Sequence, residues 1–274
     1  MIKKSSFLVP IHPPKFNSAI NLVNSYLKYY ANDNNLFLIF SSLSDKIAFD
    51  KEIKYPEHLK LIAPDFKDEG IINFKKIWAL NFLFNNFHYN KIAVFDCDSC
   101  FIKQINYEKK FNQIIKDKTV YGSFTDKEND YICLSPLKFF TKDQQNIILN
   151  KVKRDNNFLY FWFNQIPIYK KNYFLKMYKV LNFEKNIFNL KWADFDYIIY
   201  VYFLLSQNLI EIENIITDKI TMGSFLENCN LVTKNILADL IKIKPLWLPS
   251  NTNLCYLSPE ELNIFKDVFI KFHL

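Results

Sequence analysis

Short apolar runs alternate with segments of helical periodicity over the first hundred residues, and this alternation constrains the fold more than any other feature. Residues 7–11 and 36–40 predict strands, and residues 17–30 predict a helix between them. The same order follows with a short strand at 58–62 and an amphipathic helix at 74–87. Strands that alternate with helices form a parallel sheet with crossover helices. The pattern therefore predicts an α/β domain.

Residues 91–95 form the next predicted strand, and its unbroken apolar character predicts burial on both faces. Two carboxylates, Asp96 and Asp98, follow it, separated by one residue. In an extended strand end, residues two apart point to the same side. Two hard oxygen ligands side by side suit Mg²⁺ or Mn²⁺, which can hold the diphosphate of a nucleotide. The alternative is a pair of solvated aspartates in a turn.

Glycine is too scarce for the usual phosphate-binding loops. The chain has three glycines, Gly70, Gly122 and Gly223, so neither a glycine-rich dinucleotide loop nor a P-loop can be assembled. A bound metal would have to replace these backbone devices. The ends of open parallel sheets are where ligands bind, and Asp96 and Asp98 are predicted to lie at such an end.

The charge balance argues against nucleic acid as a partner. The formal net charge of +7 is carried almost wholly by lysine, and Arg154 is the one arginine. Nucleic-acid readers favour arginine, whose planar fork binds phosphates and guanine bidentately, and no compact basic run with interleaved aromatic residues is present. The lysine excess is typical of an AT-rich genome and permits a peripheral contact with an anionic inner membrane.

The cysteines and the N-terminal sequence predict a cytoplasmic location. The alternative is the cytoplasmic face of the inner membrane. Five cysteines make an odd set, and no signal peptide precedes the first predicted strand. The longest apolar run, 197–205, is too short to span a membrane. Cys97 and Cys100 are interpreted as small buried apolar side chains, since no second pair has zinc-site spacing.

Beyond residue 105 the alternation becomes less regular. The pattern predicts strands at 120–123 and 131–134, an extended aromatic stretch at 158–169, helices at 173–181 and 194–205, and an irregular segment at 242–248. No internal repeat or domain boundary is visible. We expect one domain over 1–274, with a nucleotide-binding half to about 105 and an acceptor-binding half from about 106.

This layout resembles the GT-A glycosyltransferases. The phrase F-D-C-D-S-C-F-I at 95–102 is similar to the h-D-x-D-x-x-F-h form of many bacterial sugar transferases. Looser similarity to the retaining family 8 type, which includes glycogenin and lipooligosaccharide galactosyltransferases, follows in the same order. Residues 163–166 (F-N-Q-I) lie where that family has F-N-S-G, 194–196 (D-F-D) where it has D-Q-D, and 244–247 (K-P-L-W) where it has K-P-W. The glycine after Asn164 and the H-x-x-G before Lys244 are absent.

The resemblance implies a GT-A-like (Rossmann-like) fold, with a mixed, mostly parallel sheet flanked by helices and a helical or irregular C-terminal part. It implies a Mn²⁺- or Mg²⁺-dependent transfer of a sugar from a nucleotide-diphosphate donor, with a UDP-sugar favoured. The acceptor would be a saccharide or glycolipid, in bacterial capsule or lipooligosaccharide synthesis.

The resemblance also implies binding roles for residues of the first half. Asp96 and Asp98 would hold the metal and the donor, and Pro10, Ile11 and His12 would form the backbone shelf for the base. Lys76, or its neighbour Lys75, would reach the diphosphate. The alternative for Lys76 is a solvated helix face, and for His12 a surface loop.

The transferred group needs further residues from the second half. An inverting enzyme needs a carboxylate base, and a retaining enzyme needs a group near the anomeric carbon. Asp196 is the first candidate for this catalytic role and Asp194 the second, with helix capping as the alternative for both. His273 is the candidate for a third metal ligand. Aromatic residues that could form an acceptor platform, or else belong to the core, are Trp162, Tyr160, Tyr169 and Trp192.

Two other functions compete with this interpretation. Haloacid-dehalogenase-like phosphatases also place D-x-D after an apolar strand, but in them the motif opens the domain, whereas about ninety residues precede it here. A lysine-rich module that binds an anionic membrane or nucleic acid is the non-enzymatic alternative. Metal-dependent binding of a nucleoside diphosphate would distinguish the transferase from this module.

Overall fold

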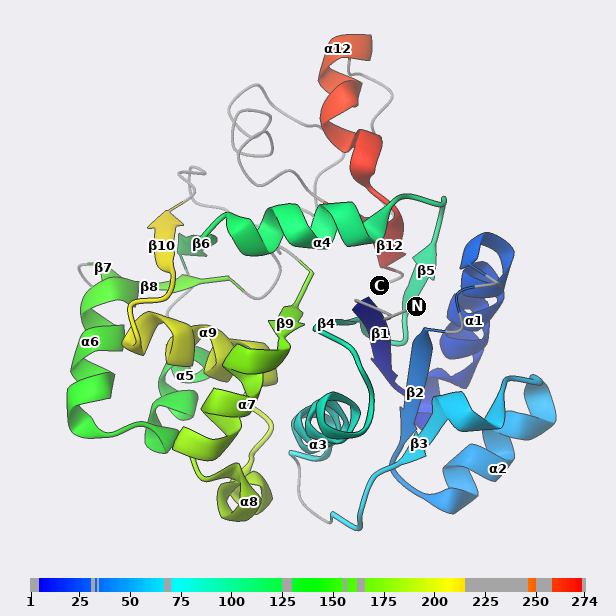
Figure 1. Cartoon of the computed structure of the whole chain (residues 1–274), viewed down its shortest axis with the longest axis horizontal. Coiled ribbons are helices and arrows are strands. Elements are labelled where there is room, and N and C mark those ends of the chain that lie inside the picture. The colour runs from blue at the N-terminus through cyan, green and yellow to red at the C-terminus, as the bar shows by residue number, and fades with distance from the viewer. Residues whose placement is uncertain are drawn as a thin grey trace.

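The main sheet is mixed and mostly parallel. The structure is a computed structural model that describes residues 5–30, 33, 35–66, 70–124, 130–154, 157–161, 166–214, 246–249 and 258–272. The main sheet has five strands in the spatial order β3-β2-β1-β4-β9, and only β9 runs antiparallel to its neighbour (Figure 1). Its strands are β1 (Ser5–Pro10), β2 (Leu36–Phe40), β3 (Lys60–Ile62), β4 (Lys91–Val94) and β9 (Ile168–Lys170).

Strands β1 and β4 lie at the centre of this sheet and end at the same edge. Leu8 of β1 pairs with Val94, and Phe7 pairs with both Leu36 and Ala93. All residues of β1, β2 and β4 are buried, as the unbroken apolar runs predict. The segments that follow β1 and β4 therefore lie next to each other at the carboxyl edge of the sheet, where ligands bind in open α/β folds.

Helices flank the sheet, which confirms the predicted fold class. Helix α3 packs against β1 and β2 and also against α7 and α9, and α1 packs against β5. The helices are α1 (Phe16–Tyr30), α2 (Leu43–Glu52), α3 (Ile71–Asn86), α4 (Tyr107–Lys116), α5 (Asp130–Leu134), α6 (Lys142–Val152), α7 (Lys171–Val180), α8 (Phe183–Asn186), α9 (Asp196–Ser206) and α12 (Pro259–Leu262). In the described ranges, no helix has the length and apolar character needed to cross a membrane.

Two smaller sheets and several 3-10 turns complete the described chain. One sheet has the order β10-β6-β8-β7 and the other β11-β12-β5. Their strands are β5 (Ser99–Phe101), β6 (Thr119–Phe124), β7 (Lys153–Arg154), β8 (Asn157–Tyr160), β10 (Glu211–Asn214), β11 (Trp247–Pro249) and β12 (Ile270–Phe272). The 3-10 helices are η1 (Pro13–Lys15), η2 (Glu57–Leu59), η4 (Ser135–Phe139), η5 (Ile187–Asn189) and η6 (Asn263–Asp267).

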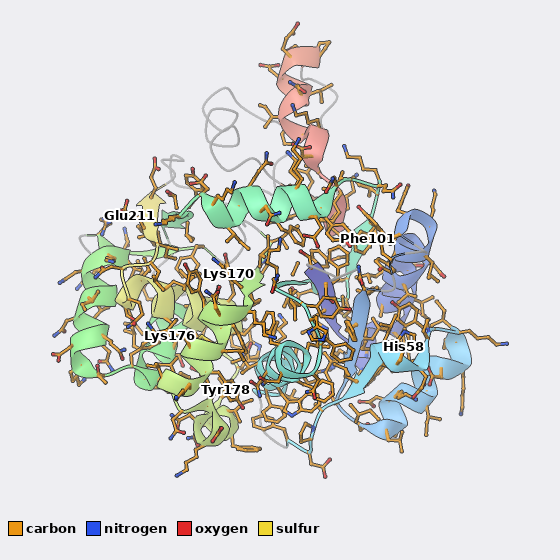
Figure 2. The ribbon with its side chains drawn as sticks, viewed as in Figure 1. His58, Phe101, Lys170, Lys176, Tyr178 and Glu211 are labelled. Carbon is orange, nitrogen blue, oxygen red and sulfur yellow. The ribbon has the colours of Figure 1, made fainter. Side chains whose placement is uncertain are left out.

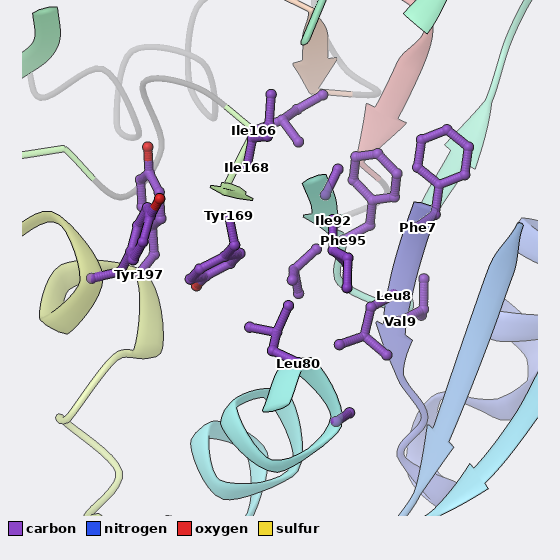
Figure 3. Close-up of a cluster of buried hydrophobic side chains, with 14 of the residues drawn as sticks. Phe7, Leu8, Val9, Leu80, Ile92, Phe95, Ile166, Ile168, Tyr169 and Tyr197 are labelled. Carbon is purple, nitrogen blue, oxygen red and sulfur yellow. The ribbon is translucent and has the colours of Figure 1, made fainter. Parts of the chain in front are cut away.

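One apolar core joins the sheet to the helices. Figure 3 shows Leu80 of α3 below the side chains of the central strands. Tyr169 and Tyr197 lie to the left in this view, and Phe7, Leu8 and Val9 of β1 lie to the right. Phe7 contacts six other aromatic rings, which come from α1, α4, β5 and the segment after β4. Phe101 of β5, labelled in Figure 2, is 3% exposed and belongs to this core. The segment before the Asp96–Asp98 turn and strand β5 after it therefore pack into the same core.

Several predicted elements need correction in the second half. Residues 131–134, predicted as a strand, belong to helix α5. Four consecutive apolar residues are too few to distinguish the period of a strand from that of a helix, so packing decided. Helices α2, α4 and α6 were not predicted, and the segment predicted to be irregular at 242–248 contains the start of β11, although 242–245 lie outside the described residues.

Lys76 does not lie on a solvated helix face, so that alternative is wrong. Lys75 is fully buried and Lys76 is 4% exposed. The helix lies between the sheet on one side and α7 and α9 on the other, so both lysines lie in the interior, although Ile72 of the same helix is 36% exposed. Buried ammonium groups need hydrogen-bond or charge partners, and both lysines find them at the carboxyl edge of the sheet.

Candidate functional site

A pocket of about 380 Å³ lies at the carboxyl edge of the main sheet. It is formed by the end of β1, the 3-10 helix η1, the first turns of α3, the turn between β4 and β5, and the loop before α9. The predicted residues Pro10, His12, Lys76, Asp96 and Asp98 all line it. The other lining residues are Lys15, Ile72, Asn73, Lys75, Cys97, Trp192 and Phe195.

Asp96 and Asp98 lie in a turn and not on the strand itself. Strand β4 ends at Val94, and the amide nitrogen of Ser99 donates to the carbonyl oxygen of Asp96 at 3.2 Å to close the turn. The Asp96 side chain is 45% exposed and that of Asp98 is 15% exposed. The two carboxylates share one pocket, although each faces its own lysine.

Lys76 connects Asp96 to the interior. Its Nζ donates to Asp96 Oδ1 at 3.1 Å and lies 3.7 Å from Asp196 Oδ1. Burial lowers the pKa of Lys76, but the charges of Asp96 and Asp196 outweigh it and hold the pKa above its ordinary value. Lys76 therefore places a charged ammonium group in the pocket wall.

Lys15 of η1 forms an ion pair with Asp98. Its side chain is 52% exposed, so this pair is screened by water and contributes little to stability. The hydrogen bond to Asp98 raises the pKa of Lys15 more than burial lowers it. Lys15 was not predicted as a site residue, because its place next to Asp98 depends on the pairing of β1 with β4.

Lys75 holds the end of β1 in place. Its Nζ donates to the carbonyl oxygen of Ile11 at 2.7 Å, and burial lowers its pKa to about 8. The predicted shelf of Pro10, Ile11 and His12 is therefore pinned from below by a lysine. His12 is exposed but lines the pocket, and burial together with the charge of Lys75 lowers its pKa, so its imidazole is neutral near pH 7.

Asp196 lies behind Lys76 and is almost fully buried. Its Oδ2 accepts a hydrogen bond from the hydroxyl group of Tyr169, and its Oδ1 has no hydrogen-bond partner among the residues that the structure describes. Burial raises the pKa of Asp196, which the charge of Lys76 partly offsets. The capping alternative for Asp196 is wrong, because Phe195 occupies the N-cap position of α9 and Asp196 is the first helical residue.

Asp194 is fully buried away from the pocket lining. It accepts from the backbone nitrogen of Lys191 and from Ser135 Oγ, both at 2.6 Å, and forms an ion pair with Lys138. These contacts anchor the loop before α9 to η4. The catalytic role predicted for Asp194 stays a prediction, and its contacts are those of a loop anchor.

Other predicted residues divide between the core, the pocket rim and positions outside the described residues. Tyr169 is fully buried and belongs to the core, whereas Trp192 is 50% exposed and lines the pocket. Cys97 is buried and Cys100 is half-buried. Positions outside the described residues include His273, Trp162, residues 163–165 and 244–245, and the side chain of Tyr160.

The two pocket carboxylates fit a divalent cation that also binds a substrate. Among the described residues, no group of three His, Cys, Asp or Glu side chains is arranged to hold a metal. Mg²⁺ commonly uses one or two protein carboxylates and completes its shell with water and substrate phosphates. Asp96 and Asp98 supply this number of ligands, so the site fits a cation that arrives with a phosphate-bearing ligand.

Comparisons with known proteins give a distant structural match. No family model matches the chain, and no curated protein matches it. Among solved structures 206 chains match, including the mannosyltransferase Ktr4p from S. cerevisiae, with 13% sequence identity and a TM-score of 0.41. That match covers 71% of this chain and 64% of the Ktr4p chain.

Proposed function

We propose that this chain is a glycosyltransferase that binds a nucleotide-diphosphate sugar together with Mn²⁺ or Mg²⁺ and transfers the sugar to a saccharide or glycolipid acceptor. Asp96 and Asp98 would hold the cation. Bound there, the cation would neutralise the negative charge that develops on the diphosphate leaving group.

The observation that carries this proposal is the charge content of the pocket. Lys15, Lys75 and Lys76 line the pocket together with Asp96 and Asp98, which leaves one net positive charge when all five are ionised. The nucleoside diphosphate that leaves the sugar has about three negative charges near pH 7. A divalent cation on the aspartates would raise the charge of the pocket to match it. The lysines would thus bind the phosphates, as a glycine-rich loop does in other nucleotide-binding proteins.

Lys76 is the side chain best placed to contact the diphosphate. It projects from α3 into the pocket, and Asp196 and Asp96 keep it charged. Because Asp196 is buried behind Lys76, we assign it to positioning this ammonium group. A direct catalytic role for Asp196, as base or as a group near the anomeric carbon, would require movement of Lys76.

The end of β1 is the proposed shelf for the base. The carbonyl oxygen of Ile11 is occupied by Lys75, and Pro10 and His12 line the pocket on either side. A neutral His12 imidazole can both donate and accept a hydrogen bond to a base edge. A uridine donor and a role in bacterial surface-glycan synthesis are the finer parts of the proposal and rest on the sequence resemblance.

The phosphatase alternative has less support. It requires Asp96 as a nucleophile in a motif that opens its domain. Strand β4 is instead an internal strand, paired with β1 and β9, and three strands of the same sheet precede it in the chain.

Thermal unfolding with nucleotides tests the proposal. The wild-type midpoint should rise with UDP or GDP only when Mn²⁺ is present, since a ligand at one hundred times its Kd adds about 2.7 kcal/mol to the unfolding free energy. Asp98→Asn should abolish the rise and leave the ligand-free midpoint nearly unchanged. Asp65→Asn is the matched control, because Asp65 is an exposed aspartate after β3 that does not line the pocket.

The outcomes separate the competing functions. Metal-dependent hydrolysis of one member of a nucleotide-sugar panel would identify the donor. Stabilisation by heparin or anionic vesicles without any response to nucleotide and Mn²⁺ would support the binding module. A full nucleotide response in Asp98→Asn would contradict the assignment of the metal ligands.

A further inference from the structure

Trp192 is an exposed aromatic residue on a firmly held loop at the rim of the pocket. It is 50% exposed and shares the pocket lining with Asp96 and Asp98. The side-chain nitrogen of the buried Asn73 donates to the carbonyl oxygens of Lys191 and Trp192, at 3.1 and 3.0 Å. The first turn of α3 thus binds the backbone of Trp192 directly.

Two further contacts hold the same loop. The buried carboxylate of Asp194 accepts from the Lys191 backbone and from Ser135 of η4. At the start of the loop, a Cβ at Gly70 would lie 2.2 Å from the carbonyl oxygen of Leu190, so the two backbones touch. These contacts fix the backbone of the loop that carries the exposed Trp192 ring. The loop would therefore lose little conformational entropy when a ligand packs on the ring.

A second exposed ring extends this surface. Tyr131 of α5 is 45% exposed, and its ring is nearly parallel to that of Trp192, with an interplanar angle of 24° and centroids 6.2 Å apart. Phe195 supports Trp192 edge-on, at 5.6 Å and 65°. Exposed aromatic surface next to a polar pocket marks a binding site more often than chance exposure does.

The position of the pair indicates which part of a substrate it would contact. Helix α3 packs between the strands β1 and β2 on one side and α9 on the other, as Figure 1 shows. The proposed base shelf lies at the end of β1, whereas Trp192 and Tyr131 come from the loop before α9 and from α5. A ligand on this pair would therefore approach the diphosphate region from the side opposite to the base.

We propose that Trp192 and Tyr131 form a stacking surface for a pyranose ring of the acceptor saccharide, an inference that rests on the proposed glycosyltransferase function. The apolar face of a pyranose presents C–H groups with partial positive charge, which the negative face of an aromatic ring attracts. The sugar hydroxyl groups point outward from the ring edge and remain hydrated. A hydroxyl group of the stacked sugar could then face the donor held at Asp96 and Asp98.

Fluorine NMR provides a direct test. The protein has four tryptophans, so labelling with 5-fluorotryptophan gives few resonances, and Trp192→Phe assigns that of Trp192. Methyl α-mannopyranoside, methyl β-glucopyranoside and methyl β-galactopyranoside serve as probes. We expect at least one to shift the Trp192 resonance while that of Trp78, which stacks on Phe82 away from the pocket lining, stays in place.

Variants make the test quantitative. Trp192→Ala and, separately, Tyr131→Ala should reduce saturation transfer to the bound pyranoside at least fivefold. Phe188→Ala should not, because Phe188 is an equally exposed aromatic residue (56%) that does not line the pocket. Two variants on different elements guard against loss of folding in one of them, which thermal unfolding would reveal.

Three results would overturn the inference: no pyranoside shifts the Trp192 resonance, only a nucleoside diphosphate does, or all three alanine variants behave alike. Mn²⁺-dependent nucleotide binding by the wild type, measured in the same samples, keeps the two proposals apart. If nucleotide binds and no pyranoside does, the stacking surface fails alone. If pyranoside binds and nucleotide does not, the glycosyltransferase proposal fails.

Discussion

Lys76 is the residue on which the electrostatics of the pocket depend. It forms an ion pair with the buried Asp196 and also contacts Asp96. Removing one member of a buried ion pair leaves an uncompensated charge, which is far more damaging than removing both. The same lysine is proposed to contact the diphosphate, so its roles in stability and in binding can be separated by experiment.

Lys76→Met should lower the unfolding free energy by about 3 kcal/mol, because it leaves Asp196 buried without its cation. Adding Asp196→Asn should restore much of that stability, since the double variant buries no net charge. Nucleotide binding should stay weak in both. Urea unfolding and isothermal titration of each variant check this. Equal stability of the single and double variants would show that the Lys76–Asp196 pair is not coupled.

Lys75 predicts a pH dependence of nucleotide binding. Its pKa of about 8 lies below its ordinary value because the side chain is buried, so it loses its charge as the pH rises through 8. Affinity for a nucleoside diphosphate with Mg²⁺ should therefore fall between pH 7 and pH 9.

The folding equilibrium should respond to Lys75 in the opposite sense. The unfolded chain binds more protons at this lysine than the folded chain does above pH 8, so the contribution of Lys75 to stability rises from there toward its unfolded pKa. Lys75→Met should flatten both profiles, as binding and unfolding titrations at each pH would show. A wild-type affinity that does not change with pH would remove Lys75 from the charge of the pocket.

The residues of the site were partly predictable from the sequence. Asp96, Asp98, Lys76, Pro10 and His12 share one pocket because each follows a strand or lies on a crossover helix, and parallel strands end at a common edge. Lys15 and Asn73 were not predicted. Their positions depend on which strands are neighbours and on how α3 packs against the loop before α9, which a single sequence does not specify.

At the scale of elements, capping signals that were present in the sequence mark helices that apolar periodicity did not reveal. Ser42 caps α2 by accepting from the Asp45 backbone, and Thr141 and Gln144 form a capping box at α6. Both helices bury only a few side chains, so their hydrophobic pattern is weak. The strongly apolar elements β1, β2, β4 and α9 were predicted to within a few residues.

The close approach of α3 to the loop before α9 predicts a large effect of one methyl group. Gly70→Ala should lower the unfolding free energy by about 1–3 kcal/mol, the range for overpacked sites, because its Cβ would meet backbone atoms of Leu190. Gly122→Ala is the matched control, since its Cβ would meet side-chain atoms no closer than 3.1 Å. Denaturant unfolding of both variants measures the difference, and a smaller loss for Gly70→Ala would contradict the packing described.

For the whole molecule, the fold class was predictable and the connections between the halves were not. The alternation of strands and helices predicted the parallel part of the main sheet. It gave no sign that β9 would add an antiparallel edge next to β4, or that β12 would pair with β5. Strand partners distant in sequence are chosen by packing over the whole chain. The predicted division at about residue 105 stays a prediction, although these two pairings cross it.

These pairings also determine when the site can form during synthesis. The Asp96–Asp98 turn lies between β4, which is flanked by residues 168–170, and β5, which is flanked by residues 270–272. A nascent chain that has emerged from the ribosome only as far as residue 160 would contain both aspartates and Lys76 but neither flanking strand. Such long-range pairing forms late and slowly. The site would therefore take its final form only after residues 270–272 have been synthesised, and the exposed edges of β4 and β5 would need protection until then.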